Sequence, residues 1–172
     1  MAKATKSSVN KGSKGSVRII SGLYRGRKLP VLLAEGLRPT TDRIKETVFN
    51  WLMPYVRDAK ALDCFAGSGS LGFEALSRGA ENITFIEMNK AAANQIKQNI
   101  DLLKATNAQI IHGDCLSHLK QAKQTFDLVF IDPPFRQGLV VECAKQLELT
   151  ESLADKAIIY LECEQELADI DL

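Results

Sequence analysis

Residues 60–79, which read KALDCFAGSGSLGFEALSRG, decide the fold. The apolar start, KALDCF, is typical of a buried strand, and LGFEALSRG is typical of a helix that ends at Gly79. Between them, Gly67, Gly69 and Gly72 follow the pattern G-x-G-x-x-G. Glycines between a strand and a helix let the backbone turn sharply and let a ligand approach the main chain closely. The stretch therefore predicts the ligand-binding loop of an α/β sheet.

Strands and helices alternate along the chain after this loop. The segments NITFIE, AQIIH, DLVFID and AIIYLE suit strands, and helical patterns separate them. Nearly continuous apolar strands joined by helices favour a mostly parallel sheet with helices on both faces. We therefore expect a Rossmann-like α/β domain that spans residues 36–172.

The amino-terminal part differs in composition. Residues 1–15 are mostly Lys, Ser, Gly and Asn with little to bury, so we expect a disordered tail. VRII and RKLPV flank the turn SGLYRG and predict a small β-hairpin within residues 16–35. A helix should follow, capped by Thr41 or Asp42 and limited by Pro54. Its expected core-facing residues are Ile44, Val48, Trp51 and Leu52.

Charge is distributed unevenly, although the net charge is only +1. Residues 1–57 hold 12 Lys and Arg against 3 Asp and Glu, whereas residues 58–172 hold 10 against 18. A basic arm on an acidic body suggests a polyanionic partner, and a solvated tail is the alternative. No apolar stretch is long enough to span a bilayer or resembles a secretory signal, so we expect a cytoplasmic protein.

The cysteines are far apart in the sequence and form no C-x-x-C pair. Such spacing indicates neither a zinc site nor a disulfide framework, and we predict no metal. Isolated thiols also fit a reducing cytosol. The four residues are Cys64, Cys115, Cys143 and Cys163.

Three carboxylates near strand ends suggest which cofactor the loop binds. Glu87 lies 20 residues after Gly67, where an acid can accept hydrogen bonds from ribose hydroxyls. The glycine pattern alone fits NAD, FAD or S-adenosyl-L-methionine (AdoMet). Asp63, beside the loop, suits the ammonium of a methionyl group and would repel a pyrophosphate, which favours AdoMet. Asp114 can accept a hydrogen bond from an adenine amine, or cap the next helix, or do both.

The strand DLVFID ends in the motif DPPF, residues 132–135, which should face the same crevice as the glycine loop. An exocyclic amine of guanine or adenine is a poor nucleophile because its lone pair is delocalised into the ring. Acceptors such as the Asp132 carboxylate and the Pro133 carbonyl would favour its pyramidal form, and Pro134 would stiffen the turn. Phe135 offers a face for base stacking. A plain turn that closes the strand is the alternative.

These motifs together resemble class I AdoMet-dependent methyltransferases. The run VRIISG, then LRPTTDRIKETVFNWL, then LDCFAGSGSLG is similar to the bacterial RsmD family, over about residues 16–163. The resemblance implies transfer of a methyl group from AdoMet to the exocyclic N2 of one guanine in small-subunit (16S) rRNA. It also implies that this RNA, in the subunit or an assembly intermediate, is the partner.

The resemblance assigns roles to residues of this chain. It implies that Asp63, Gly67, Gly69, Glu87, Asp114, Arg38, Thr40 and Thr41 hold or cover the cofactor. It implies that Asp132, Pro133, Pro134 and Phe135 form the catalytic turn. It implies that Arg18, Arg25, Arg27 and Lys28 contact RNA and that Arg43 helps to shape the base pocket. A solvated strand pair is the alternative for the basic hairpin.

The carboxyl end departs from the family pattern. Class I methyltransferases normally have two more strands after the one matched by AIIYLE, and this chain ends about ten residues beyond it. We therefore expect the C-terminal strands to be missing and one sheet edge to be unpaired.

Other functions stay open at this stage. A related enzyme could methylate adenine N6 in DNA or a glutamine side chain in a protein. An RNA-binding or assembly protein could retain AdoMet without turning it over. A nicotinamide-linked oxidoreductase would rest on the glycine pattern alone.

Overall fold

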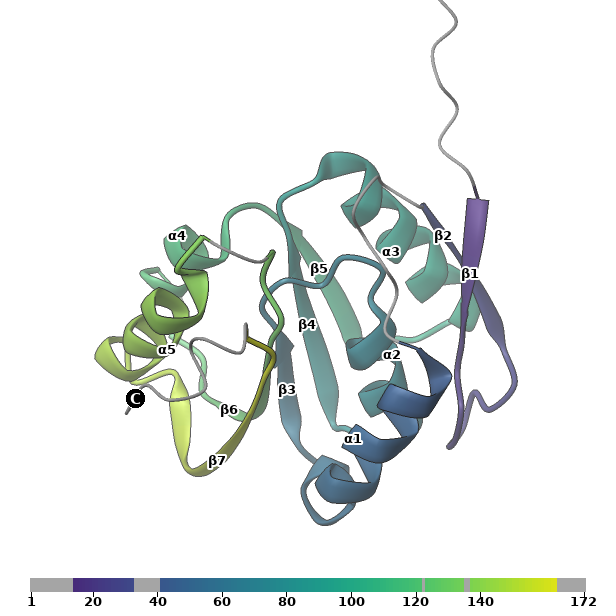
Figure 1. The fold of residues 1–172 in the computed structure, drawn as a ribbon, viewed down its shortest axis with the longest axis horizontal. Helices are drawn as coiled ribbons and strands as arrows, with labels where there is room; N and C mark the ends of the chain where they lie inside the picture. Colours follow the sequence, from purple (N-terminus) through teal and green to yellow (C-terminus); the bar gives the residue numbers. More distant parts are fainter. Residues whose placement is uncertain (1–13, 33–40, 122, 135–136, 164–172) are drawn as a thin grey trace, which may run out of the picture.

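A parallel β-sheet lies at the centre of the computed structural model, which describes residues 14–32, 41–121, 123–134 and 137–163 (Figure 1). The sheet has five strands in the order β5-β4-β3-β6-β7, and each neighbouring pair is parallel. They are β3 (Lys60–Asp63), β4 (Asn82–Glu87), β5 (Ala108–His112), β6 (Phe126–Ile131) and β7 (Leu153–Leu161). The predicted α/β fold with a parallel sheet is confirmed.

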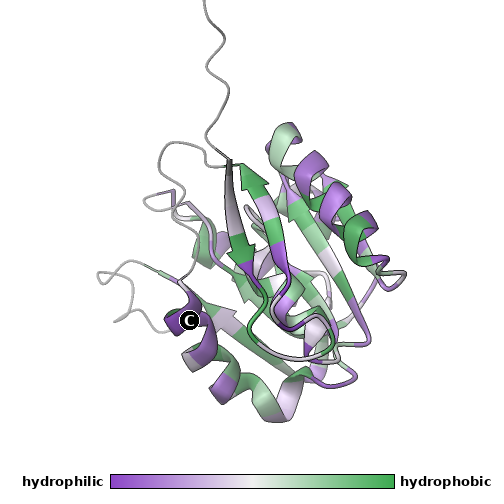
Figure 2. Cartoon of the chain, turned by 90° about the vertical axis from the view of Figure 1, so that its right-hand side faces the viewer, coloured by the Kyte–Doolittle hydropathy of each residue, from purple (hydrophilic) through white to green (hydrophobic). Residues whose placement is uncertain are grey.

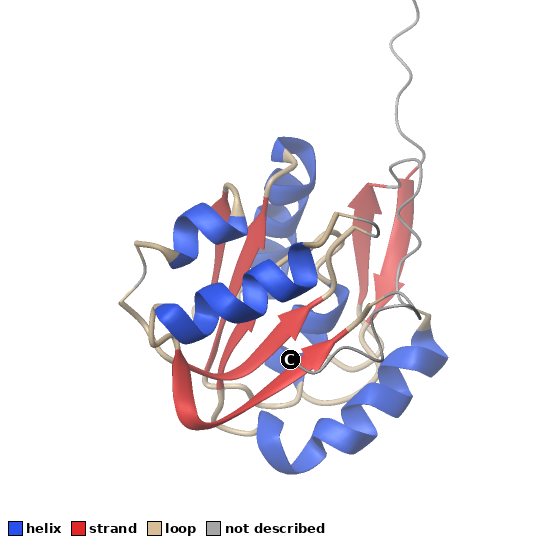
Figure 3. Ribbon diagram, turned by 60° about the vertical axis from the view of Figure 1, so that its left-hand side comes forward, coloured by secondary structure: helices blue, strands red, loops and turns tan. Residues whose placement is uncertain are grey.

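Helices cover both faces of the sheet (Figures 1 and 3). Helices α1, α2 and α3 pack on one face, and α4 and α5 pack on the other. Their bounds are α1 (Asp42–Val56), α2 (Ser70–Ser77), α3 (Lys90–Leu103), α4 (Cys115–Leu119) and α5 (Leu139–Leu149). The outer helices combine hydrophilic and hydrophobic residues, as expected of helices with one buried face (Figure 2), whereas α2 is buried along its whole length.

Alternation along β6 explains why two cores form. Leu128 and Phe130 are buried against α1 and α2, whereas Val129 and Ile131 are buried against α4 and α5. Successive side chains of a strand point to opposite faces, so a strand covered on both sides is apolar throughout.

The hairpin is formed by β1 (Lys14–Arg18) and β2 (Lys28–Leu32), which pair antiparallel beside α3. It begins earlier than expected, since Lys14 and Gly15, assigned to the tail, are paired strand residues. Gly15 pairs with Val31, which is buried in the same core cluster as α1, α2 and α3, so the pairing extends beyond Ser16. Residues 1–13 and the domain boundary expected at residues 35–36 lie outside the described residues.

Helix α1 is capped as predicted, but its buried face is different. The Thr41 hydroxyl accepts a hydrogen bond from the Ile44 N–H at 3.3 Å. Ile44 and Trp51, expected in the core, are 47% and 68% exposed, whereas Lys45 and Phe49 are buried. Polar contacts of Lys45 inside the fold set this rotation of the helix, and apolar periodicity alone does not reveal them.

Pro54 does not end α1, which continues to Val56. Proline lacks the N–H that would bond to the carbonyl four residues earlier, but its fixed φ is compatible with a helix, so the two residues that follow it can continue α1. The expectation that Pro54 limits the helix was therefore wrong by two residues.

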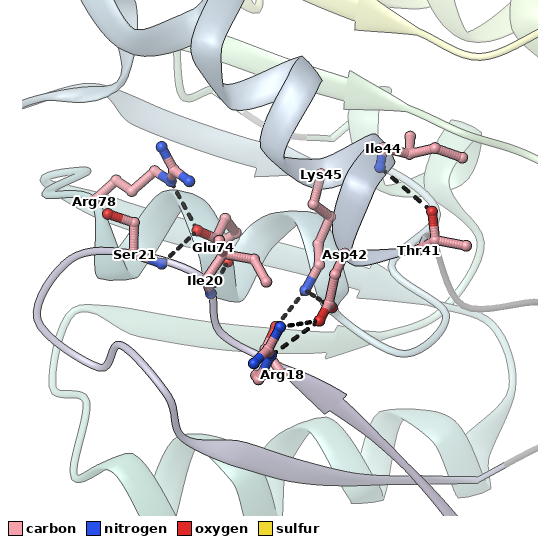
Figure 4. A network of polar contacts seen from close by, with 9 residues as sticks. All are labelled: Arg18, Ile20, Ser21, Thr41, Asp42, Ile44, Lys45, Glu74 and Arg78. Atoms are coloured by element: carbon pink, nitrogen blue, oxygen red, sulfur yellow. Dashed lines mark hydrogen bonds and ion pairs between the residues drawn. The ribbon is translucent and has the colours of Figure 1, made fainter.

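Glu74 on α2 fastens the chain that follows β1 (Figure 4). Its carboxylate is fully buried and accepts hydrogen bonds from the N–H groups of Ile20 (2.8 Å) and Ser21 (3.1 Å). The Arg78 guanidinium donates to the same carboxylate at 2.8 Å. These contacts take Ile20 out of the ladder, so β1 ends at Arg18 and not at the expected Ile20.

Lys45 provides a second attachment between α1 and the hairpin (Figure 4). Its ammonium donates to the Arg18 carbonyl and lies 3.8 Å from an Asp42 carboxylate oxygen. Burial lowers the pKa of Lys45, while the negative charges of Glu74 and Asp42 oppose that shift. Arg18 also pairs with Asp42 through its side chain at 2.8 Å. A buried cation thus ties α1 to the end of β1, which lies 27 residues earlier in the sequence.

Strand β7 begins at Leu153, four residues before the expected AIIYLE segment. A register shift lies between Phe126 and Leu128, where β6 pairs with it. Among the described residues, β7 pairs with β6 alone, and residues 164–172 lie outside them. No helix in the described part of the chain is long and apolar enough to cross a membrane.

Glu74→Ala should destabilise the fold by about 3–5 kcal/mol, because it leaves two backbone N–H groups and the Arg78 guanidinium without their buried acceptor. Urea denaturation followed by circular dichroism measures the loss. Glu148→Ala, at an exposed position on α5, is the matched control and should change stability by less than about 0.5 kcal/mol. Equal stability of the two variants would contradict the role of Glu74.

Candidate active site

Two loops leave the sheet side by side, from the carboxyl ends of β3 and β6. The register pairs Asp63 with Phe130, and the Cys64 N–H donates to the Phe130 carbonyl at 3.0 Å. The glycine loop follows the first strand directly, and the DPPF motif follows the second. Strand order reverses here, because β4 and β5 lie on one side of β3 while β6 and β7 lie on the other. Ligands of open α/β sheets bind at this point.

The glycine loop is shaped by its own backbone. Gly69 adopts φ +75° at the start of α2, and its N–H donates to the Ala66 carbonyl at 2.6 Å. Left-handed backbone of this kind favours glycine. Gly72 packs so closely on β4 that a Cβ there would lie 2.2 Å from the Phe85 ring. The loop and the start of α2 are thereby held against the ends of β3 and β4.

Glu87 braces the loop from the end of β4. Its carboxylate accepts hydrogen bonds from the Gly67 N–H and the Asn89 N–H, both at 2.7 Å. The side chain is half-buried, and a carboxylate has about four acceptor positions in total. Two positions thus remain for the hydroxyls of a ligand.

Asp63 is the buried acid of the site, with 2% of its surface exposed. It accepts a hydrogen bond from the Gly72 N–H at 3.2 Å, in the first turn of α2. Burial raises the pKa of Asp63 to about 7, and the negative charges of Asp132 and Glu87 add to that shift. Asp132 and Glu87 therefore lie close enough to Asp63 for their negative charge to disfavour its ionised form, and a positively charged ligand group would offset that effect.

Asp132 lies partly buried at the turn after β6. Burial raises the pKa of Asp132 to about 7, and the charge of Glu162 adds to the shift. Glu162 follows β7, its N–H donates to the Ile131 carbonyl at 2.9 Å, and its carboxylate accepts from the Tyr160 hydroxyl at 2.9 Å. Pro133 is buried and Pro134 is exposed.

Glu162 and Tyr160 were not predicted from the sequence. The signal was available, because Glu162 ends the strand AIIYL, and the carboxyl ends of parallel strands share one edge of a sheet. Phe135, expected to stack on the base, lies outside the described residues.

Asp114 caps α4, which was one of its two expected roles. Its carboxylate accepts a hydrogen bond from the Ser117 N–H at 2.8 Å. Hydrogen bonds from the Ser117 side chain and backbone lower the pKa of Asp114. The carboxylate is exposed beside the end of β5, so a ligand can still reach it.

The segment before α1 is only partly described. Arg38, Pro39 and Thr40 lie outside the described residues. Thr41 acts as the helix cap, and Arg43 is exposed at the start of α1.

A groove of about 300 Å³ lies between α1 and β7. Tyr160 lines it and also contacts Glu162, so the groove adjoins the Asp132 turn. The remaining lining residues are Arg43, Ile44, Thr47, Val48 and Trp51.

The hairpin cations fall into two groups. Arg18 pairs with Asp42, and the Arg27 guanidinium donates to the Leu102 carbonyl at 3.2 Å. Arg25 and Lys28 are exposed, at the turn and at the start of β2. The first pair contributes to the fold, and the second pair presents charge to solvent.

The structure brings together three cysteines that the sequence keeps apart. The sulfur atoms of Cys64, Cys115 and Cys143 lie within 4.8 Å of one another in the core between the sheet and α4 and α5. Sequence spacing gave no sign of this cluster, because its members come from three different segments.

Comparisons with known proteins bear on this geometry. The family model described as Conserved hypothetical protein 95 matches residues 17–171. The chain belongs to this family. Ribosomal RNA small subunit methyltransferase D of Escherichia coli strain K12 is 52% identical over 157 residues, which are 91% of this chain and 79% of the relative. The resemblance to the RsmD family is confirmed.

Other RsmD-family relatives agree in sequence and in fold. The protein of the same name from Haemophilus influenzae is 53% identical over 158 residues, 90% of this chain and 82% of the relative. The solved structure of the putative methyltransferase yhhF from Escherichia coli superposes with a TM-score of 0.84 at 49% identity, covering 92% of this chain and 86% of that one.

Glu162→Gln should lower the pKa of Asp132 from about 7 while leaving it above 3.8, because the charge is removed but the burial stays. The raised pKa means that protonated Asp132 favours the folded state at low pH and that this contribution is lost as pH rises toward 7. The substitution should narrow the pH range over which this contribution to stability is lost, because the pKa of folded Asp132 moves closer to 3.8. Carbon-13 NMR titration of the aspartate carboxyls measures the shift.

Glu148→Gln, on the exposed face of α5, is the control for that titration and should leave Asp132 unchanged. An unchanged Asp132 pKa in Glu162→Gln would mean that the two carboxylates do not interact.

Proposed function

We propose that this protein transfers a methyl group from AdoMet to the exocyclic N2 amine of a guanine in small-subunit (16S) rRNA. The observation that carries the proposal is the proximity of Asp63, below the glycine loop, to Asp132, at the DPPF turn. In a member of the RsmD family, this arrangement supports a cofactor site and an amine-binding turn that share one crevice.

The acidic character of the crevice favours AdoMet over a dinucleotide. Asp63, Glu87 and Asp132 would repel a pyrophosphate but attract a cofactor that carries an ammonium and a sulfonium. Glu87 keeps acceptor positions for ribose hydroxyls, and the exposed Asp114 carboxylate can accept from an adenine amine in addition to the Ser117 N–H. Gly67 and Gly69 let the cofactor lie against the backbone. AdoMet, when bound here, supplies an electrophilic methyl group.

The DPPF turn would hold the acceptor amine. The Asp132 carboxylate accepts one amine hydrogen and the Pro133 carbonyl accepts the other, which localises the nitrogen lone pair. Burial of Asp132 excludes water from this contact and strengthens it. Reaction then depends on aligning nitrogen, methyl and sulfur, and a rigid turn beside a rigid loop provides that alignment. Phe135 would stack on the base, as the family pattern implies.

The basic hairpin would provide phosphate contacts. Arg25 and Lys28 are exposed on it, and Arg43 is exposed at the start of α1, on the same side of the sheet. Relatives from two organisms are named for ribosomal RNA of the small subunit. Arg38 and Thr40, from the RPTTDR run, would cover the bound cofactor. The substrate in this proposal is 16S rRNA within the small subunit or an assembly intermediate.

Asp132→Ala should abolish methyl transfer to guanine, with loss of at least about 100-fold, while AdoMet and RNA still bind. Labelled AdoMet and small subunits from a strain lacking the enzyme provide the assay, and mass spectrometry of digested RNA identifies the product. Asp155→Ala, at an exposed position on β7, is the control and should keep full activity.

Each alternative acceptor has its own outcome in that assay. Detection of methylated adenine in DNA, or of methylated glutamine in a ribosomal protein, in place of methylated guanine would show that the enzyme acts on a different substrate. RNA binding without any methyl transfer by the native chain would favour an assembly protein.

Arg25→Ala combined with Lys28→Ala should weaken RNA binding and reduce the dependence of log K on log salt by about 1.5–2, because two phosphate contacts are lost. Filter binding over a range of salt concentrations measures the slope. Lys104→Ala with Lys156→Ala removes two exposed charges from the α/β body and should leave the slope unchanged. Equal slopes in both double variants would mean that Arg25 and Lys28 of the hairpin do not contact RNA phosphates.

A further inference from the structure

Three thiols meet in the core on the α4–α5 side of the sheet. The sulfur atoms of Cys64, Cys115 and Cys143 all lie within 4.8 Å of one another. Cys64 follows β3, Cys115 begins α4, and Cys143 lies within α5. None of the three is more than 3% exposed. The fold therefore brings three sulfur atoms, which are potential ligands, together from three separate segments.

The spacing suits a single ion bound by three sulfurs. A thiolate–metal bond of about 2.3 Å places three ligands around one ion roughly 4 Å apart. Small side-chain rotations that move each sulfur by less than about 1 Å would bring these sulfurs to that separation. Hydrogen bonds from the Cys115 and Cys64 thiols lower the pKa of Cys143, as expected for sulfurs that already face one another.

The surroundings restrict the charge of the ion. The cluster is enclosed by apolar side chains, so a complex with net charge would be costly. Three thiolates on a divalent ion leave one negative charge, whereas three thiolates on a trivalent ion leave none. The enclosing side chains include Leu62, Ile86, Leu119, Val129, Ile131 and Leu147.

The number of available ligands also favours a trivalent ion. Among the residues that the structure describes, no fourth His, Cys, Asp or Glu joins the group of three. Zinc in structural sites takes four ligands, which three buried thiols cannot supply. A trivalent metalloid completes its bonding with three sulfurs.

We propose that Cys64, Cys115 and Cys143 form a binding site for a trivalent thiophilic metalloid, with As(III) as its representative. Arsenous acid would form three As–S bonds and lose its three hydroxides. Each hydroxide leaves as water with the proton of one thiol, so three waters form and no atom changes oxidation state. The product is neutral, as the apolar core requires.

The position of the site links it to the crevice. Cys64 directly follows Asp63, and Cys115 directly follows Asp114. A bound ion would therefore join the segments that carry two carboxylates of the candidate active site. Access requires opening between the sheet and α4, which is only five residues long.

Titration of the reduced full chain with arsenite tests the site. Native mass spectrometry should show one arsenic per chain with loss of three waters, and arsenite should raise the melting temperature. Cys115→Ala and Cys143→Ala should each weaken binding by more than about tenfold. Cys163→Ala, which removes the cysteine outside the cluster, is the matched control and should bind like the native chain. Zinc, tested in parallel, should bind more weakly.

A second measurement uses the native chain alone and does not depend on how variants fold. Over long incubation, local opening exposes buried thiols to alkylation, so arsenite should slow alkylation of the three clustered cysteines, as mapped by peptide mass spectrometry, and leave the rate at Cys163 unchanged. Protection of Cys163, unchanged binding in the cluster variants, or absence of a 1:1 adduct would each overturn the proposal. Neither measurement involves methyl transfer, so their failure is distinct from failure of the proposed function.

Discussion

The pairing of β3 with β6 is the constraint on which the site depends. These strands are far apart in the sequence, and their register sets Asp63 opposite Phe130. Both strands are apolar on both faces, so both must occupy the middle of a sheet covered by helices. Once they are neighbours, the two loops that follow them leave from one edge. The positions of the proposed cofactor and acceptor sites are therefore a consequence of core packing.

The same packing concentrates negative charge. Asp63 is buried beside the start of α2, and Asp132 is partly buried at the turn after β6, so burial raises the pKa of both carboxyls. A charged cofactor with positive groups would relieve that repulsion. The site is thus complementary to a cation before any ligand arrives, which accords with preorganised electrostatics as a source of binding and catalysis.

The hairpin is part of the same structural unit. Buried Glu74 accepts a hydrogen bond from the backbone N–H of Ile20, just after β1. Buried Lys45 donates to the backbone carbonyl of Arg18, at the end of β1. Buried charges of this kind require their partners, so the hairpin cannot shift without leaving a charge unpaired. Arg18 and Arg27 are engaged in fixing the hairpin, and Arg25 and Lys28 remain on its exposed surface.

The sequence by itself determined the α/β class, the glycine loop, the hairpin and the caps at Thr41 and Asp114, because each depends on local propensity or on periodicity along a few residues. The tertiary structure alone decided what depends on contacts between distant segments. It buried Lys45 and exposed Trp51, it added Glu162 beside Asp132, and it gathered three cysteines into one cluster. Periodicity identifies which residues can be buried. The segments that pack against them across the core decide which of them are buried. Those segments lie far away in the sequence, so a local pattern does not reveal them.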